Sequence, residues 1–226
     1  MCGRYNIITD AQALYDAFQV DAGTDAAKLA RYNVAPATEQ LVIVEEEGRR
    51  VARWHHWGLI PHWAKDKSIG HRTINARGES VAVKPAFRAA FRQRRCLVPA
   101  TGFYEWKAEA GGKQPYLVGL KNGGLFAFAG LWESWNAPEG ELRSFTIITT
   151  APNALMARIY DRMPVIVPRA HYARWLSPSV QTPAQVQPMI ASYPEAELRA
   201  VPVGRGINNA RNQGPALIEP TGAPLD

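Results

Sequence analysis

Apolar positions recur along the chain with two different spacings. Helical spacing over residues 10–18, which begin at the capping pair Thr9-Asp10, predicts a short amphipathic helix ending at Phe18. The same reasoning predicts three further helices, at 80–93 with a break at Pro85, at 153–160 and at 170–176. Runs rich in β-branched and aromatic residues predict strands at 40–44, 51–57, 96–106, 115–120, 125–135 and 144–150.

Strands that cluster in mid-chain, with helices before and after them, are typical of the α+β class. We therefore predict a single α+β domain built on a strongly curved, mainly antiparallel sheet system with flanking short helices. The chain has no internal repeat and no linker rich in glycine or serine, so we expect one domain over residues 1–218. The proline-containing end, residues 219–226, is expected to be a loose tail.

Composition narrows the functional classes. Hydrophobic residues make up 46% of the 226 residues, enough for a substantial core. The formal net charge is +6, mostly from arginine, whose planar group binds phosphate with two donors. A polyanionic partner fits this balance, and a merely basic surface is the alternative. Because no 18-residue apolar run or signal-peptide pattern occurs, we expect a cytoplasmic monomer with no membrane partner.

The two cysteines have different surroundings. Cys96 lies in an apolar run, which predicts a buried strand residue. Cys2 follows the initiator Met1, and removal of Met1 would leave an α-amine beside the thiol. With pKa values of ~8 for the amine and ~8.5 for the thiol, both groups are partly nucleophilic near neutral pH. Since most Met-Cys starts carry no function, the motifs downstream decide whether Cys2 does.

Polar motifs recur in one order along the chain. They are Met1-Cys2-Gly3-Arg4, then 31–36 (RYNVAP), 57–63 (WGLIPHW) with 75–79 (NARGE), 102–107 (GFYEWK), and 149–153 (TTAPN) continuing to 160–164 (YDRMP). Together they closely resemble the SRAP family, the SOS-response-associated peptidase-like proteins whose best known members shield abasic sites in single-stranded DNA. The resemblance extends to 212–214 near the C-terminus. It implies a covalent DNA-protein crosslink in which Cys2 closes a thiazolidine ring on the aldehyde of the abasic sugar.

The residues can perform that chemistry without a cofactor. The amine of Cys2 can form a Schiff base with the aldehyde, and the thiolate can then close a five-membered ring. Because a carbinolamine must lose water, an acid or base is needed nearby. Glu105 suits this role, since aromatic neighbours would raise the pKa of its carboxyl group. The alternative is an ordinary edge glutamate paired with an arginine.

The resemblance also assigns roles to polar and aromatic residues. Asn75 would hold the sugar or the N-terminus by its amide. DNA-binding roles are implied for Arg4, Asn33, Trp63, Arg77, Trp106 and Arg162. The two tryptophans would stack on bases beside the lesion, and Arg77 would bind a flanking phosphate. Taken singly, such residues are more often surface, capping or turn groups.

One position departs from the family pattern. Tyr160 stands where the family has histidine in His-Asp-Arg-Met-Pro. A phenol with a pKa of ~10 donates a hydrogen bond but is a poor base, whereas an imidazole titrates near ~6.5. In the family this histidine is implicated in sugar-ring opening and crosslink turnover, so we expect these proton transfers, and not binding, to be weakened.

Two other functions stay open. The same nucleophile could serve an N-terminal cysteine peptidase, and Tyr160 could leave a noncovalent binder of single-stranded DNA. A metal site is not predicted, because four histidines lie close together in the sequence but their spacing matches no usual zinc pattern. These are His55, His56, His62 and His71.

Overall fold

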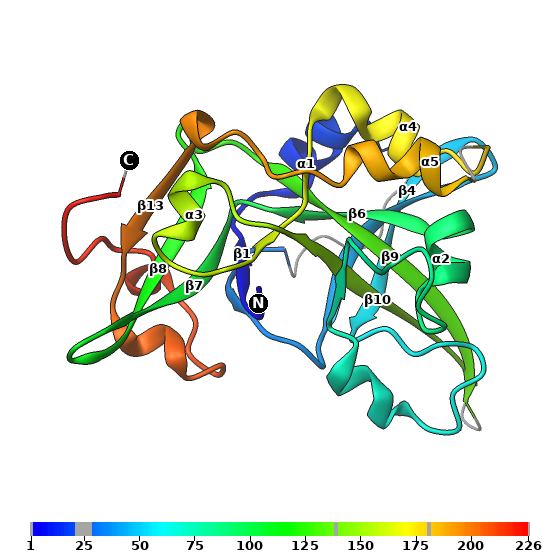
Figure 1. Ribbon diagram of the computed structural model, residues 1–226, viewed down its shortest axis with the longest axis horizontal. Coiled ribbons are helices and arrows are strands. Elements are labelled where there is room, and N and C mark those ends of the chain that lie inside the picture. Colours follow the sequence, from blue (N-terminus) through cyan, green and yellow to red (C-terminus); the bar gives the residue numbers. More distant parts are fainter. Residues whose placement is uncertain (1, 21–28, 138–139, 180–181, 226) are drawn as a thin grey trace.

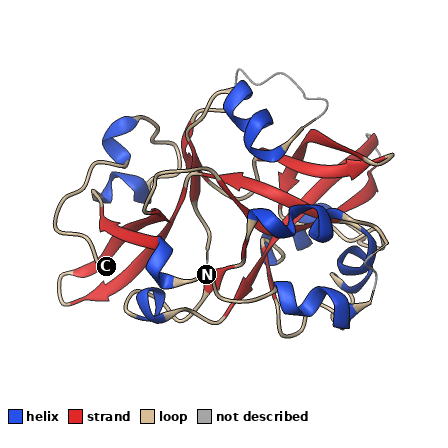
Figure 2. Ribbon diagram, turned by 90° about the horizontal axis from the view of Figure 1, so that it is seen from above, coloured by secondary structure: helices blue, strands red, loops and turns tan. Residues whose placement is uncertain are grey.

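The computed structural model describes residues 2–20, 29–137, 140–179 and 182–225. Met1, whose removal we predict, and the last residue of the predicted tail lie outside them. The strands described form two sheets, a five-stranded sheet and an eight-stranded one. In Figure 1, β13, β8 and β7 lie on one side of β1, and the strands of the larger sheet lie on the other. Figure 2 shows the two groups of strands, with helices around them.

The larger sheet closes on itself. Strand β10 pairs in parallel with β4 and antiparallel with β9, and β3 and β6 complete the ring. The strands of this barrel are β3 (Glu39–Glu46), β4 (Arg49–Trp57), β6 (Arg95–Ala100), β9 (Phe126–Ala137) and β10 (Gly140–Thr150). The short strands β5 (Asn75–Arg77), β11 (Met163–Pro164) and β12 (Ile166–Val167) add to its edges. Because the five barrel strands form a closed ring, each of them is paired on both sides over part of its length.

The smaller sheet is antiparallel and open. Its order is β13-β8-β7-β1-β2. The strands are β1 (Tyr5–Ile7), β2 (Arg31–Val34), β7 (Gly102–Glu109), β8 (Gly112–Leu120) and β13 (Leu198–Pro202). Thr101 alone separates β6 of the barrel from β7, and its backbone N–H donates to Asn6 O at 3.0 Å. One continuous run of chain therefore ties the two sheets together.

The helices are short and cover the outside of the strands (Figure 2). They are α1 (Ala11–Phe18), α2 (Arg88–Gln93), α3 (Ala154–Ala157), α4 (Tyr172–Leu176) and α5 (Pro183–Val186). Short 3-10 helices include η1 (Lys67–Arg72), η2 (Arg169–His171), η3 (Gln187–Met189), η4 (Glu195–Glu197), η5 (Arg205–Asn208) and η6 (Pro215–Leu217). Within the described ranges, no helix is long and apolar enough to cross a membrane.

The predicted α+β class is confirmed, and so are most of the predicted elements. The Asp10 side chain caps α1 by accepting from Ala13 N at 2.8 Å. The helix predicted at 80–93 is wrong in its first half, where the chain makes turns up to Phe87 and only α2 is helical. Lys84 precedes a proline, which disfavours helical backbone there. The predicted strand 96–106 is two strands, because the chain changes sheets at Thr101.

Aromatic rings pack where the two sheets meet. Tyr5 of β1 lies 5.3 Å from Trp57 and 5.7 Å from Phe128, measured between ring centroids. Phe103 of β7 meets the same Phe128 edge to face at 6.0 Å. Since Trp57 and Phe128 belong to the barrel, one aromatic cluster serves both sheets. Its burial fixes β1 and β7, the strands next to Cys2, against the barrel wall.

Arg95 and the end of the chain show two further anchoring devices. The buried guanidinium of Arg95 donates to Trp175 O, Phe91 O and Arg92 O, and so satisfies carbonyl groups at the ends of α4 and α2. At the C-terminus, Leu225 and Ala200 exchange backbone hydrogen bonds at 2.8 and 3.3 Å. The segment that we predicted to be loose therefore lies bonded along β13.

Candidate functional site

Cys2 lies just before β1, in the seam between the two sheets. Its side chain is fully buried, and its thiol lies 3.9 Å from the carbonyl oxygen of Arg4. Burial raises the pKa of the Cys2 thiol well above its usual value, and the nearby carboxylate of Glu105 raises it further. The resting thiol is therefore protonated, and a base must remove its proton before it can attack.

Asn75 holds Cys2 by its backbone. As the first residue of β5 it pairs with Ile147 of β10, which fixes it on the barrel. Its amide Nδ2 donates to Cys2 O at 2.9 Å. Its Oδ1 is buried and accepts no hydrogen bond from the residues that the structure describes. A buried amide oxygen of this kind is an acceptor for a donor such as an α-amine or a sugar hydroxyl.

Glu105 stands on β7, beside the start of β1. The two strands are in register at Tyr5 and Phe103, and Tyr104 N donates to Arg4 O at 3.0 Å. Glu105 is only 2% exposed, and burial raises the pKa of its carboxyl group to about 7, with Asp161 adding to the rise. Near neutral pH both of its protonation states are populated, as proton transfer requires.

A cavity of about 430 Å³ opens beside Glu105. Its lining also includes Trp106, Lys113, Tyr160 and Asn208. The indole N–H of Trp106 donates to Asn208 Oδ1 at 2.8 Å, which fixes one wall. Burial and the carboxylates of Asp161 and Glu105 raise the pKa of the Tyr160 hydroxyl, which therefore stays protonated. Tyr160 therefore lines the same cavity as Glu105, where its hydroxyl can donate a hydrogen bond.

Lys113 and Asn208 were missed by our sequence analysis. Lys113 is an exposed residue at the start of β8, where it pairs with Ala108 of β7. Asn208 ends η5, far away in the sequence. A positive charge on the hairpin that follows Glu105 was the available signal for Lys113. No local pattern points to Asn208.

Arg4 and Asn33 hold a loop that carries one wall of the cavity. Arg4 Nη1 donates to Asn33 Oδ1 at 2.9 Å and to Ile207 O at 2.8 Å. Asn33 Nδ2 donates to Asn209 O, and Gln213 Oε1 accepts from Asn33 N. These bonds hold the loop 205–213 against β2, so both side chains contact protein and position Asn208.

Arg162 and Arg77 differ in their freedom to bind a phosphate. Arg162 makes a two-pronged ion pair with Glu79, at 2.6 and 3.0 Å, and donates to Thr149 O at 2.8 Å. Arg77 is exposed on β5, next to Asn75. The guanidinium of Arg77 is therefore the more accessible of the two.

Trp63 lies apart from these residues. Its side chain is 51% exposed and lines a different cavity of about 530 Å³, together with Lys65, His71 and Arg72. An exposed indole beside cations is suited to stacking on a base.

In the described residues no three His, Cys, Asp or Glu side chains gather as metal ligands would. The structure thus brings together Cys2, Asn75, Glu105, Trp106 and Tyr160.

A closed barrel joined to an open antiparallel sheet defines an α+β protein, and its candidate site places a thiol, an amide and a buried carboxyl group in the seam between the two. Comparison with known proteins then gives the family. The model of the SOS response associated peptidase (SRAP) family matches residues 1–210, so the chain belongs to the SRAP family.

Relatives match nearly the whole chain. It is 40% identical to the abasic site processing protein YoqW of Bacillus subtilis, over 97% of this chain and 99% of that protein. It is 28% identical to the abasic site processing protein YedK of Escherichia coli, over 97% and 100%. Among solved structures, a protein from Bacteroides thetaiotaomicron superposes with a TM-score of 0.84 at 26% identity, covering 96% of this chain and 99% of that one.

Proposed function

We propose that this protein captures abasic sites in single-stranded DNA covalently, through the α-amine and thiol of Cys2 after removal of Met1. The observation that carries the proposal is the meeting of Cys2, Asn75 and Glu105 in one buried seam beside an open cavity. The printed names of its relatives, abasic site processing proteins, support a DNA substrate of this kind.

The first half of the reaction uses Glu105 as an acid. The amine of Cys2 attacks the C1′ aldehyde of the ring-opened sugar and gives a carbinolamine. Glu105, protonated in part because the pKa of its carboxyl group is about 7, donates a proton to the departing hydroxyl. One water leaves, and a protonated Schiff base forms between the Cys2 nitrogen and C1′.

The second half uses Glu105 as a base. Its carboxylate, now deprotonated, takes the proton of the Cys2 thiol, whose raised pKa makes this help necessary. The sulfur bonds to C1′, and the electron pair of the C=N bond returns to nitrogen. A five-membered thiazolidine with a neutral secondary amine results, and Glu105 is again protonated, as it was at the start. Aldehyde and aminothiol have lost one water in total.

The surrounding residues hold the reactants. Asn75 is a positioning residue: Nδ2 fixes the Cys2 carbonyl, and Oδ1 offers an acceptor for the new α-amine. Lys113 supplies a cation for a flanking phosphate, and the wall formed by Trp106 offers a stacking face. Tyr160 donates a hydrogen bond to the sugar in place of the proton transfer that an imidazole would perform.

The test is a crosslinking assay. The protein, with Met1 removal verified by mass spectrometry, is mixed with single-stranded DNA that carries one abasic site. We expect an adduct that survives denaturation, is absent with an intact strand and is lost in Cys2→Ala. Cys96→Ala, which removes the other buried thiol, is the matched control and retains the adduct.

The same assay separates the alternatives. Tight binding of the strand without an adduct would favour a noncovalent binder and contradict the covalent proposal. An adduct that persists in Cys2→Ala would place the nucleophile elsewhere. A peptidase instead requires cleavage of a peptide substrate that depends on Cys2 and is unaffected by abasic DNA.

A further inference from the structure

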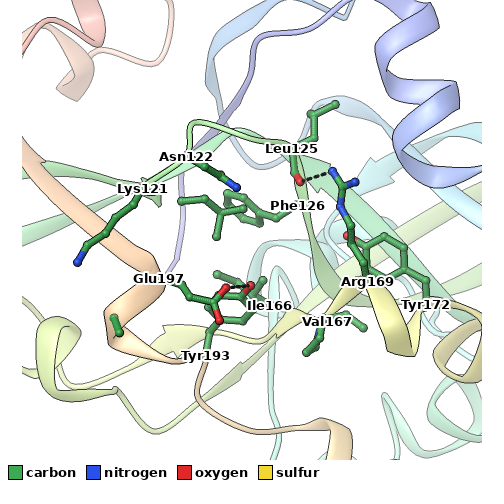
Figure 3. A pocket seen from close by; sticks show the side chains of 13 residues that line it. Lys121, Asn122, Leu125, Phe126, Ile166, Val167, Arg169, Tyr172, Tyr193 and Glu197 are labelled. Carbon is green, nitrogen blue, oxygen red and sulfur yellow. Dashed lines mark hydrogen bonds between the residues drawn. The ribbon is translucent and has the colours of Figure 1, made fainter.

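A third cavity, of about 590 Å³, lies at the far end of β8 from the site (Figure 3). Strand β8 begins next to Lys113, which lines the proposed site, and ends at Leu120, which lines this third cavity. Seven residues of extended chain span ~23 Å at ~3.3 Å each. The third cavity is therefore separate from the one beside Glu105, and no step proposed above uses it.

This cavity has an apolar floor and a charged rim. Phe126, Ile166 and Val167 form part of the floor, and each is at most 3% exposed. Lys121 and Arg169 are exposed at the rim, and Figure 3 shows them on opposite sides. The size is in the usual range of small-molecule sites, which combine an apolar lining with a few polar groups.

Tyr172 contributes an unsatisfied hydrogen-bond donor to the lining of this cavity. Its side chain is 2% exposed, and its hydroxyl makes no hydrogen bond with any residue that the structure describes. The backbone N–H of Ala127 interacts with the hydroxyl, but an N–H can only donate. The phenol proton therefore lacks an acceptor, although buried hydroxyl groups are normally paired. An acceptor on a ligand in the cavity would supply it.

The charges indicate what kind of acceptor this is. Arg169 uses one nitrogen on Leu125 O at 3.3 Å and has other donors left. The carboxylate of Glu197 accepts from the hydroxyl of Tyr193 at 2.9 Å and keeps its charge, so with two cations against one carboxylate the rim is net positive. An anionic group that accepts hydrogen bonds meets both Arg169 and Tyr172.

We propose that this cavity binds a nucleotide, with its phosphate between Arg169 and Tyr172 and its base on the apolar floor around Phe126. A base offers the flat face that such a floor accommodates, and the phosphate matches the donors. The nucleotide can come from two sources: a free mononucleotide, or a residue of a bound DNA strand several nucleotides from the lesion. The second source rests on the proposed function, and the first does not.

The test uses the Cys2→Ala variant, so that no crosslink interferes. Isothermal titration calorimetry measures the binding of 2′-deoxyadenosine 5′-monophosphate, 2′-deoxyadenosine and inorganic phosphate. We expect the monophosphate to bind most tightly, and about tenfold more weakly when Tyr172→Phe or Arg169→Gln is added. The phenyl ring of Tyr172→Phe keeps the stack on Phe18, so the fold is retained. Arg88→Gln, an exposed arginine on α2, is the matched control and leaves affinity unchanged.

A second measurement distinguishes the sources. Abasic strands with two or six nucleotides on each side of the lesion are compared by fluorescence anisotropy. If a strand residue occupies the cavity, the longer strand gains affinity that Tyr172→Phe removes. Mononucleotide binding without that gain identifies a free nucleotide as the occupant. Three outcomes would overturn the proposal, whether or not Cys2 crosslinks. They are failure of the mononucleotide to bind at millimolar concentration, equally tight binding of phosphate alone, and an affinity for the mononucleotide that neither variant changes.

Discussion

The barrel wall around Cys96 and the seam around Cys2 both bury a thiol completely, and burial raises the pKa of both. Their neighbours differ. Cys96 faces Gly130, where an added Cβ would lie 2.7 Å from its sulfur, so the strands around it are packed as tightly as their backbones allow. Cys2 instead has an amide and a titratable carboxyl group within the same seam. Burial alone makes a thiol inert, and the polar groups buried with it decide whether it can react.

The largest effect that we predict in the barrel region comes from Arg95→Met. This change removes donors from the carbonyl groups at the ends of α2 and α4 and leaves them buried and unpaired. We expect the free energy of unfolding to fall by about 3 kcal/mol, measured by urea denaturation. Arg88→Met on the exposed side of α2 is the control. A loss below about 1 kcal/mol in Arg95→Met would show that the barrel does not depend on this side chain.

Glu105→Gln should sharpen the contrast on the side of Cys2. An amide can neither protonate the departing hydroxyl nor accept the thiol proton, so we expect the crosslinking rate to fall about 100-fold in single-turnover assays. Glu109→Gln, exposed on the same strand, should leave the rate unchanged. In the wild-type protein the rate should peak between about pH 7 and pH 8, because the carboxyl group, with its pKa of about 7, must be protonated while the amine, with a pKa of ~8, must have lost its proton. Retention of wild-type rate in Glu105→Gln would remove Glu105 from the mechanism.

The raised pKa of Glu105 also makes the free energy of unfolding depend on pH. Between the unfolded pKa of ~4.3 and the folded value of about 7, the folded protein binds more protons at Glu105 than the unfolded chain does. The contribution of Glu105 to the free energy of unfolding is therefore largest at low pH and decreases as pH rises through this window. Comparison of denaturation curves for wild type and Glu105→Gln across these pH values isolates that contribution.

Substitutions of Tyr160 have the smallest expected effects. An imidazole titrates near ~6.5 and can transfer the protons that a phenol holds, so we expect crosslinking about tenfold faster than in the wild-type protein. Tyr160→Phe, which removes the hydroxyl alone, should slow it by about threefold through loss of one hydrogen bond. If the histidine variant matches the wild type in both formation and release, position 160 does not handle protons in this protein.

The strands of the barrel could be predicted because their apolar runs are long, and the family motifs located Cys2, Asn75 and Glu105. Other features depend on distant parts of the chain. Strands β1 and β2 are three and four residues long, too short for a clear alternation, and form by pairing with each other and with β7. The side chains of Arg4 and Asn33 read as DNA ligands, yet they bond to a loop over 170 residues away.

That loop has a consequence for how the site can change. The side chains of Arg4 and Asn33 donate hydrogen bonds to backbone carbonyl oxygens of this loop, and every amino acid supplies such an oxygen. The anchors therefore tolerate variation in the side chains of the loop, including Asn208 at the cavity wall. Meanwhile Cys2 and Glu105 are fixed by the strands. A library that diversifies the exposed positions of 205–213 would vary the shape of the cavity while Cys2 and Glu105 stay in place. Under the proposed function, this loop is the natural starting point for redirecting the protein to other aldehydes.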